Sequence, residues 1–341
     1  MTSGESTEVT HDGPTTDGPT IDGPTIDGPT IDPAEVTDGP APGPRPDISV
    51  VIASVNGLPY PLSCLAALAV QRGTLGSEVV VADCTGPGTV AAIRERHPGV
   101  RVLAFDEPKS VPWLRAAGLR TATGRLVAVT EDHCVPDPNW YERLVAAHRR
   151  TGWAAVGGGV RNASTERLVD WAVFFCEYSQ HMDPVPDGPS AFIPGMNVAY
   201  DMDALADMRE VFAEGLWENF LHDKLRAAGH TCGMSSDIVV GHQKHFTIPM
   251  FLAERFHYSR SFAGMRVVDE GAVGKVKWAV LSLGLPPLLM TRLTRNVLSK
   301  RKHLGRYAQS LPLIAVFTVA WSAGEFWGYL TGPGDSLVKV R

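Results

Sequence analysis

The sequence predicts an α/β protein with a doubly wound, mostly parallel sheet, followed by apolar C-terminal helices. Three observations support this fold class. From residue 48 onward, apolar runs alternate with segments of helical length, which is the βαβα order of such sheets. These runs are continuously apolar rather than alternating, as is typical of parallel strands covered on both faces. Two longer apolar segments then follow, at 278–291 and 307–331.

The first 46 residues are expected to lie outside this fold. They consist largely of a DGPT repeat that starts at Asp12, and they contain almost no large apolar side chains. Ordering such a segment costs backbone entropy with no burial to offset it, so a disordered tail is predicted for 1–46. The tail holds nine acidic residues and one basic residue, whereas the remaining chain holds 28 and 30. The body is therefore nearly neutral, and a nucleic-acid binder is not indicated.

The folded region begins with strands and helices in alternation. Strands are predicted at 48–54, 78–83, 100–105 and 125–130, and helices at 60–71, 88–96, 110–121 and 138–150. Further strands are predicted at 153–160 and 237–242, helices at 166–178, 216–228 and 248–263, and a loop rich in Pro and Gly at 183–195. In open sheets of this kind, ligands bind beyond the carboxyl ends of the strands. Chemistry is therefore expected at those ends.

Acidic side chains follow two of the predicted strands. Asp83 ends the second strand, where it can accept hydrogen bonds from a base or a ribose, or merely cap the next helix. The fourth strand runs into Glu131, Asp132 and His133. Two carboxylates and an imidazole at one strand end can hold a divalent metal that clamps the phosphates of a nucleotide. The alternative is an exposed turn with ordinary charges.

Five segments together resemble the family 2 glycosyltransferases in order and spacing. They are SVVIASVN (49–56), VVVADCTGPGT (79–89), LRAAGLRTATGRLVAVTEDHCVPDPNW (114–140), GMN (195–197) and WENFLHDKLRAAG (217–229). The resemblance covers about residues 47–265. It implies a sheet of the nucleotide-diphospho-sugar transferase type, a nucleoside-diphosphate sugar as donor, and Mn²⁺ or Mg²⁺ as cofactor.

The resemblance also implies a metal site. Counted back from Pro136, Glu131 and His133 occupy the two acidic positions of the family's D-x-D motif. Both residue types are competent ligands, although His favours softer metals than Mg²⁺. His242 stands just after the last strand, where the family often places a His near the metal or diphosphate. The alternative for His242 is an ordinary side chain at a strand end.

Further roles are implied for the donor. Arg115 matches the arginine of the family's R-N-x-G-L pattern and is expected to contact the pyrophosphate, although Ala116 replaces the asparagine. The resemblance assigns the other nucleotide-sugar contacts to Ala53, Asn56, Asp83 and Asp132.

The family's E-D pair fixes the catalytic base. Leu225 and Gly229 set its register, so that Trp217 replaces the Glu and Glu218 takes the position of the base Asp. A Glu can equally remove the proton of an acceptor hydroxyl. Trp217 and Asn197 are assigned to the acceptor side, with an ordinary turn residue as the alternative for Asn197.

The C-terminal segment, 266–341, is expected to attach the protein to a membrane. A span needs about 20 apolar residues, so 278–291 is too short and is expected to lie in the interface or form a re-entrant turn. The segment 307–331 can cross a membrane, at the free-energy cost of burying the acidic side chain of Glu325, or it can lie in the membrane surface. Six basic residues and no acid lie between 292 and 306, and a full hairpin would place them outside, against the positive-inside rule. A pair of soluble core helices is the alternative.

Five scattered cysteines without a C-x-x-C pair argue against a disulfide framework and fit a reducing compartment. No N-terminal secretion signal is apparent, so the domain at 47–265 is expected on the cytoplasmic side of the cell membrane.

The sequence thus predicts an inverting, metal-dependent glycosyltransferase that acts on a lipid-linked or polysaccharide acceptor at the membrane surface. The replaced D-x-D and E-D residues leave a noncatalytic membrane-bound scaffold as one alternative. A nucleotidyltransferase that attacks at phosphorus is the other.

Overall fold

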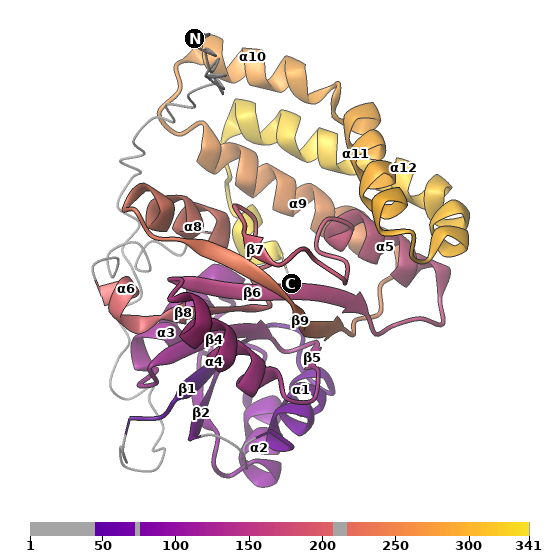
Figure 1. The fold of residues 1–341 in the computed structure, drawn as a ribbon. Coiled ribbons are helices and arrows are strands. Elements are labelled where there is room, and N and C mark those ends of the chain that lie inside the picture. The colour runs from indigo at the N-terminus through magenta and orange to yellow at the C-terminus, as the bar shows by residue number, and fades with distance from the viewer. Residues whose placement is uncertain (1–44, 72–75, 207–216, 341) are drawn as a thin grey trace, which may run out of the picture.

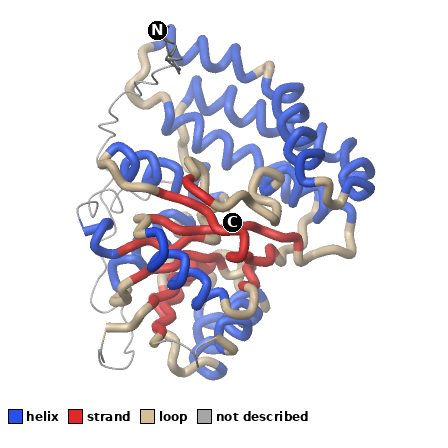
Figure 2. The backbone as a smooth tube through the Cα atoms, viewed as in Figure 1, coloured by secondary structure: helices blue, strands red, loops and turns tan. Residues whose placement is uncertain are grey.

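The computed structural model describes residues 45–71, 76–206 and 217–340. Its centre is a nine-stranded mixed sheet with helices on both faces (Figures 1 and 2). The strand order is β3-β2-β1-β4-β8-β6-β9-β5, and β7 pairs with β9. The predicted tail lies outside the described residues, except for its last two positions.

The first half of the sheet is parallel, as the continuous apolar runs predicted. It contains β1 (Ile48–Ser54), β2 (Ser77–Asp83), β3 (Arg101–Ala104) and β4 (Leu126–Glu131), connected by α1 (Tyr60–Ala69), α2 (Pro87–Arg96) and α3 (Val111–Thr121). Every residue of β1 is buried, because the strand is covered on both faces. Register pairs Ala53 with Glu131 and Ser54 with Asp83. Asp83 and Glu131 therefore lie at the same edge of the sheet.

Beyond β4 the sheet becomes mixed. It contains β5 (Cys134–Pro136), β6 (Ala155–Asn162), β7 (Gly188–Pro189), β8 (Val198–Asp201) and β9 (Cys232–His242), with α4 (Trp140–Thr151), α5 (Leu168–Tyr178), α6 (Met202–Ala206) and α8 (Glu218–Ala227) among them. The strand β8 is antiparallel to both β4 and β6, while β9 is parallel to β6. The sequence pattern missed the short strands β5 and β7 and began β9 five residues too late.

The last helices form a layer at the end of the molecule opposite α2 (Figure 1). They are α9 (Ile248–Arg266), α10 (Ala272–Ser282), α11 (Leu285–Lys300) and α12 (Leu304–Thr331), followed by the short 3₁₀ helix η2 (Ser336–Lys339). Phe251 of α9 and Phe317 of α12 meet edge to face with ring centroids 4.6 Å apart, inside the main hydrophobic core. The C-terminal helices therefore share their core with the sheet.

Glycines bring α9 and α12 into close contact. A Cβ atom on Gly328 would lie 2.4 Å from the carbonyl oxygen of Arg260, and one on Gly324 would lie 2.4 Å from that of Phe256. Since both neighbours are backbone atoms, a side chain at either position would push the two helices apart. The spacing of these glycines puts them on one face of α12.

Within the described residues, α12 alone is long and apolar enough to cross a membrane, and α10 with α11 meets the criterion only as a pair bent by 57°. Buried core helices meet the same criterion, and 39% of the apolar window of α12 is buried in the protein. Glu325 is accommodated within the fold, because it accepts hydrogen bonds from Trp321 Nε1 at 2.8 Å and from the Tyr329 hydroxyl at 2.9 Å.

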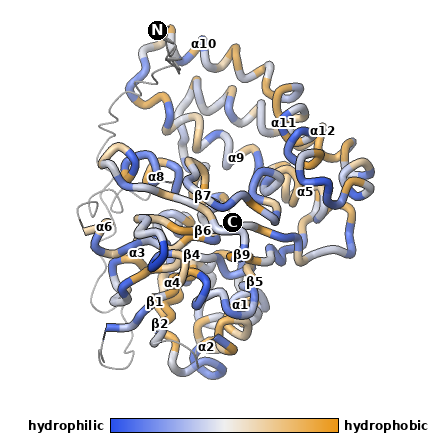
Figure 3. Tube along the Cα trace, viewed as in Figure 1, coloured by the Kyte–Doolittle hydropathy of each residue, from blue (hydrophilic) through white to orange (hydrophobic). Residues whose placement is uncertain are grey.

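An apolar stripe nevertheless faces outward on α10. Val273, Val276, Val280 and Leu283 are spaced on one helical face and are between 53% and 86% exposed. Figure 3 shows hydrophobic and hydrophilic residues side by side along this C-terminal layer. The stripe has no partner within the described part of the chain.

The basic segment at 292–306, which begins within α11 and runs past its end, is only partly free. Lys300 donates to the carbonyl of Pro184 at 2.8 Å, and Lys302 pairs with Asp183 at 3.1 Å. Both lysines therefore hold α11 against the loop that follows α5. The arginines of the segment are exposed; they are Arg292, Arg295, Arg301 and Arg306.

Candidate active site

One arginine bridges two carboxylates at the carboxyl edge of the sheet. Arg115 lies on α3, Glu131 ends β4, and Glu218 begins α8. The guanidinium donates from Nη1 to Glu218 Oε2 at 2.9 Å and from Nη2 to Glu131 Oε1. Burial acts to lower the pKa of Arg115, but the two carboxylates outweigh burial and raise it, so the bridge stays charged. The predicted base and the predicted metal ligand thus face one planar cation.

Close packing holds this bridge in place. A Cβ atom on Gly195, in the loop before β8, would lie 2.4 Å from the carboxyl carbon of Glu218 and 2.7 Å from Arg115 Nη1. Only a residue without a side chain leaves room for the two charged groups to meet. This explains the glycine of the GMN segment by geometry.

The two predicted ligands Glu131 and His133 also lie together. Glu131 Oε2 is 3.3 Å from His133 Nε2, and the rings of His133 and His242 meet edge to face with centroids 4.8 Å apart. Burial, with the charges of His133 and Lys244, holds the pKa of His242 well below its ordinary value. Its imidazole is therefore neutral at physiological pH.

These donors fit a divalent metal as a two-ligand site. Two ligands at adjacent octahedral positions, each about 2.1 Å from an ion, lie about 3.0 Å apart, which is close to the Glu131 to His133 separation. Within the described residues, no group of three or more His, Cys, Asp or Glu side chains is arranged to hold a metal. Remaining ligands would have to come from a diphosphate and water, as is usual for metals in phosphate-transfer sites.

Asp132 and Asn56 form the support beneath this pair. Asp132 is fully buried and accepts from the backbone nitrogens of Val55 at 2.9 Å and Asn56 at 2.8 Å, and from Asn56 Nδ2 at 2.7 Å. Burial alone would raise the pKa of Asp132, but the hydrogen bond and charge of His133, with the donors of Asn56, lower it. Asp132 therefore fixes the loop after β1 and orients His133, and a direct contact with the donor remains a prediction.

Asp83 is similarly engaged inside the protein. It accepts from the Ser54 hydroxyl at 2.5 Å and from the Thr85 backbone nitrogen at 2.9 Å. Burial raises its pKa, against the effect of these donors. Neither contact is a helix cap, because α2 begins at Pro87 after Gly86 and receives no side-chain cap. The donor contacts assigned to Asp83 and to Ala53, which is fully buried at the end of β1, stay predictions.

Asn197 requires a correction. Its side chain is fully buried, accepts from Trp140 Nε1 at 2.8 Å, and donates to the carbonyls of Gly159 at 2.8 Å and Ile238 at 3.3 Å. Its amide is therefore fully used in joining α4, β6 and β9. The structure gives Asn197 a role in the core and not on the acceptor side.

A cavity of about 680 Å³ opens from the bridge toward the C-terminal helices. Six of the predicted site residues line it: Arg115, Glu131, His133, Trp217, Glu218 and His242. The other five, all within the described chain, do not: Ala53, Asn56, Asp83, Asp132 and Asn197. The predicted site residues thus form two groups: six that face the cavity and five that lie outside its lining.

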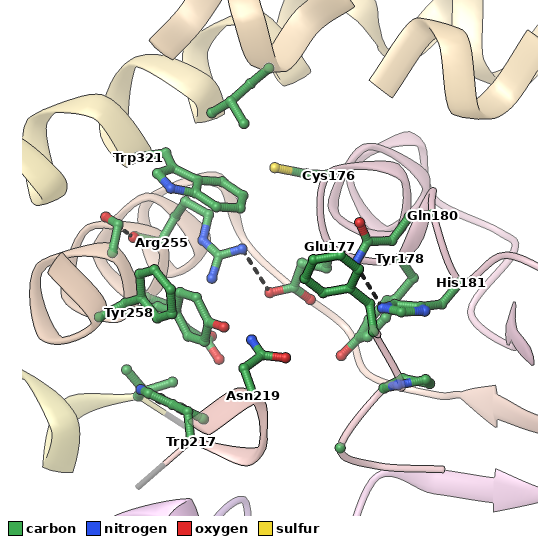
Figure 4. A pocket seen from close by; sticks show the side chains of 18 of the residues that line it. Cys176, Glu177, Tyr178, Gln180, His181, Trp217, Asn219, Arg255, Tyr258 and Trp321 are labelled. Carbon is green, nitrogen blue, oxygen red and sulfur yellow. Dashed lines mark hydrogen bonds and ion pairs between the residues drawn. The ribbon is translucent and has the colours of Figure 1, made fainter. Parts of the chain in front are cut away.

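The far wall of the cavity comes from residues that the sequence pattern did not indicate (Figure 4). Arg255 on α9 points toward Glu177 on α5, with Nη1 3.7 Å from Oε1. Its guanidinium lies between Tyr258 and Trp321, 4.3 and 4.5 Å from their ring centroids. Burial raises the pKa of Glu177 to about 7 although Arg255 opposes this. The one available signal was the concentration of aromatic and basic residues in 248–263.

Residues 49–209 match the model of glycosyl transferase family 2. This segment belongs to that family. The family 2 segment carries Arg115, Glu131 and His133, so the arginine bridge begins within it. Glu218 and the far-wall residues of α9 and α12 follow it in the chain, whereas Glu177 lies within it.

Two similar proteins are consistent with this assignment. The chain is 31% identical over 109 residues to the succinoglycan biosynthesis protein ExoO of Rhizobium meliloti (strain 1021), and the match covers 31% of each protein. The chain therefore spans about a third of that relative. It also resembles the mannosyltransferase PcManGT of Pyrobaculum calidifontis, with a TM-score of 0.51, 17% identity, and coverage of 83% of this chain and 88% of that one. This likeness confirms the predicted fold, with a sheet of the nucleotide-diphospho-sugar transferase type.

Proposed function

We propose that the protein is an inverting glycosyltransferase that moves a sugar from a nucleoside diphosphate to an acceptor hydroxyl. The observation that carries this proposal is the bridge from Arg115 to both Glu131 and Glu218 at one end of the cavity. One guanidinium thus separates the carboxylate on the metal side, Glu131, from the carboxylate proposed as the base, Glu218. Such a spacing suits a reaction in which the diphosphate leaves on one side and the acceptor enters on the other.

In the proposed reaction, Glu218 is the general base. The acceptor oxygen forms a bond to the anomeric carbon as the bond from that carbon to the diphosphate oxygen breaks, and the hydroxyl proton passes to the Glu218 carboxylate. One displacement inverts the anomeric configuration. Arg115 keeps both carboxylates oriented before the substrates bind, and its charge favours the diphosphate.

Glu131 and His133, with His242 beside them, would hold the metal. A divalent ion, when bound, would neutralise charge on the leaving diphosphate. The structure of PcManGT contains GDP-Man and Mn²⁺, which supports a nucleotide-sugar donor and a divalent ion here. The mixed oxygen and nitrogen donors favour Mn²⁺ over Mg²⁺.

The outward stripe of α10 and the exposed arginines in and after α11 support attachment to an anionic membrane on the cytoplasmic side. Valines and a leucine would enter the interface while the arginines meet lipid phosphates. Since ExoO is named for succinoglycan biosynthesis, a polysaccharide or its lipid-linked precursor is the proposed acceptor class.

The test is turnover of a panel of UDP, GDP and TDP sugars with Mn²⁺, followed by product analysis. Release of nucleoside diphosphate, lost on chelation of the metal, is expected. A scaffold would release nothing, and a nucleotidyltransferase, which attacks at the α-phosphorus, would release sugar 1-phosphate. Either of those results would reject the proposal.

A further inference from the structure

The cavity continues past Glu218 into a part that donor chemistry leaves unused. There Arg255 is only 4% exposed, and its Nε atom has no hydrogen-bond partner in the described structure. Trp217, which lines the same cavity, likewise has an unpartnered and buried Nε1 atom. Buried donors without acceptors are costly in a folded protein, so two at one cavity indicate a missing acceptor.

The charge on Arg255 defines the chemistry of that acceptor. Its ion pair with Glu177 is 3.7 Å long, which is long for a charge-assisted hydrogen bond, and Glu254 and Glu325 act on it electrostatically from further away. The aromatic rings of Tyr258 and Trp321 fix the guanidinium plane (Figure 4). A fixed guanidinium with a free donor suits a planar or tetrahedral oxyanion such as phosphate.

Beyond Arg255 the cavity becomes apolar. Five leucines of α10 and α11 line it: Leu281, Leu285, Leu288, Leu289 and Leu293. Leu289 and Leu293 are 7% exposed, whereas Leu281 and Leu288 are 54% and 53% exposed, so this lining runs from the interior to the surface. Arg266 and Arg292 also line it, and Arg266 lies over the ring of Trp278, 4.4 Å from its centroid.

We propose that this cavity binds an acceptor that carries a phosphate on a hydrocarbon chain. The phosphate lies beside Arg255, the chain runs along the leucines of α10 and α11, and the hydroxyl to be glycosylated points back to Glu218. Charge complementarity and the sequence of acid, cation and apolar lining along one cavity carry this assignment. It rests on the proposed function, in which the acceptor hydroxyl must lie beside the Glu218 carboxylate.

Binding of three probes to the full chain tests it without any donor. Dodecyl phosphate, below its micelle concentration, presents head and chain together, whereas inorganic phosphate and dodecanol present them separately. Isothermal titration should show dodecyl phosphate binding at least tenfold more tightly than either part. Equal affinity for inorganic phosphate would identify a plain anion site and overturn the lipid assignment.

Variants locate the site. Arg255→Met should weaken dodecyl phosphate at least tenfold, Arg255→Lys should weaken it less, and Leu289→Gln should weaken it while leaving inorganic phosphate unchanged. Arg94→Met, the same change on the exposed face of α2, is the matched control. If Arg255→Met fails to fold, Leu289→Gln and Arg292→Met at the apolar end carry the test. Wild-type affinity in folded variants would overturn the inference.

The proposed acceptor site and the proposed transferase activity can be rejected independently. Turnover of a nucleotide sugar without Arg255-dependent binding of dodecyl phosphate would reject this acceptor site alone. Binding of dodecyl phosphate without turnover of any nucleotide sugar would reject the transferase.

Discussion

At the scale of single residues, the site depends on a permanent cation held between two carboxylates. Because Arg115 is nearly buried, Glu131 and Glu218 lose water on one side and gain a fixed charge-assisted partner instead. Removal of either carboxylate would leave the guanidinium less well compensated, so activity and local order are coupled here. The residues around the bridge allow three tests that separate chemistry from structure.

The first concerns the base. Glu218→Gln keeps the size of the side chain and a hydrogen-bond acceptor for Arg115 but removes the basic carboxylate, so turnover should fall by about 100-fold or more while donor affinity is retained. Steady-state kinetics and titration with nucleoside diphosphate measure the two quantities. Asp223→Asn, one turn further along α8 and exposed, is the control and should change neither. Near-normal turnover in Glu218→Gln would place the base elsewhere.

The second concerns the glycine under the bridge. Gly195→Ala should displace Glu218 and Arg115 and lower turnover by about 100-fold, since displacements of about 1 Å at a reacting centre have effects of that size. Thermal stability should change little, because the atoms that must move are the ends of side chains. Gly88→Ala on α2, where a Cβ would meet nothing within 4 Å, is the matched control. Full activity in Gly195→Ala would contradict the close approach.

The third concerns the buried amide. Asn197→Leu leaves Trp140 Nε1 and the Gly159 carbonyl without partners, and should lower the free energy of unfolding by about 2 kcal/mol. Urea denaturation measures this change. Asn219→Leu, which alters a side chain that lines the cavity, should leave stability nearly unchanged and affect acceptor use instead. The opposite pattern would restore Asn197 to the acceptor side.

At the scale of secondary-structure elements, α9 is the central helix of the C-terminal half. One side contributes Arg255 to the cavity, and another receives the glycines of α12. Close helix contact through small residues leaves no room for adjustment, so the cavity width depends on it. The geometry of the far wall is therefore set by helix packing as much as by the side chains that line it.

Substitution of one glycine tests this dependence. Gly328→Ala puts a Cβ atom 2.4 Å from a backbone carbonyl of α9, and should lower the free energy of unfolding by about 1 to 3 kcal/mol through overpacking, despite the better helix propensity of Ala. Gly305→Ala, in the first turn of α12 with open space around it, should be neutral or slightly stabilising. Thermal unfolding compares the two. Equal effects would mean that α9 and α12 are not held at this contact.

Prediction from sequence succeeded where the pattern is local. The strand at 48–54 is buried on both faces, so each residue is apolar or small, and the predicted and observed bounds agree. The short β5 has three residues and no periodicity to detect. Arg255 was missed because an arginine in a basic helix looks solvent-exposed until α12 folds over it. The assignment of Asn197 depended on partners in distant segments, which no local pattern specifies.

At the scale of the whole molecule, the C-terminal helices are part of the fold and also candidates for the membrane contact. Ile314 and Phe317 of α12 are fully buried in the core shared with the sheet, so removing residues 271–341 would expose that core as well as remove the proposed membrane contact. A test of attachment therefore has to change the surface and leave the packing intact.

The exposed arginines allow such a test. Replacing Arg295, Arg301 and Arg306 by Gln should weaken partition to anionic vesicles by about 1 kcal/mol per residue, and leave the weaker partition to neutral vesicles nearly unchanged. Vesicle cosedimentation at low and high salt measures both. The same change at Arg94, Arg96 and Arg149, on α2 and α4, is the control. If the full-length protein does not cosediment with vesicles of either composition, α10 is an ordinary surface helix and α12 an ordinary core helix.

Two separate stretches of the sequence line the cavity, and each can acquire substitutions independently of the other. Arg115, Glu131 and His133 belong to the segment that matches the family model, whereas Arg255, Trp321 and the leucines lie well after that segment. If the proposed function and acceptor site hold, mutations that change donor binding and mutations that change acceptor binding fall largely in different parts of the gene. A lineage could then change its acceptor by varying its last hundred residues while it keeps the same donor, and chimeras between relatives could exploit the same division.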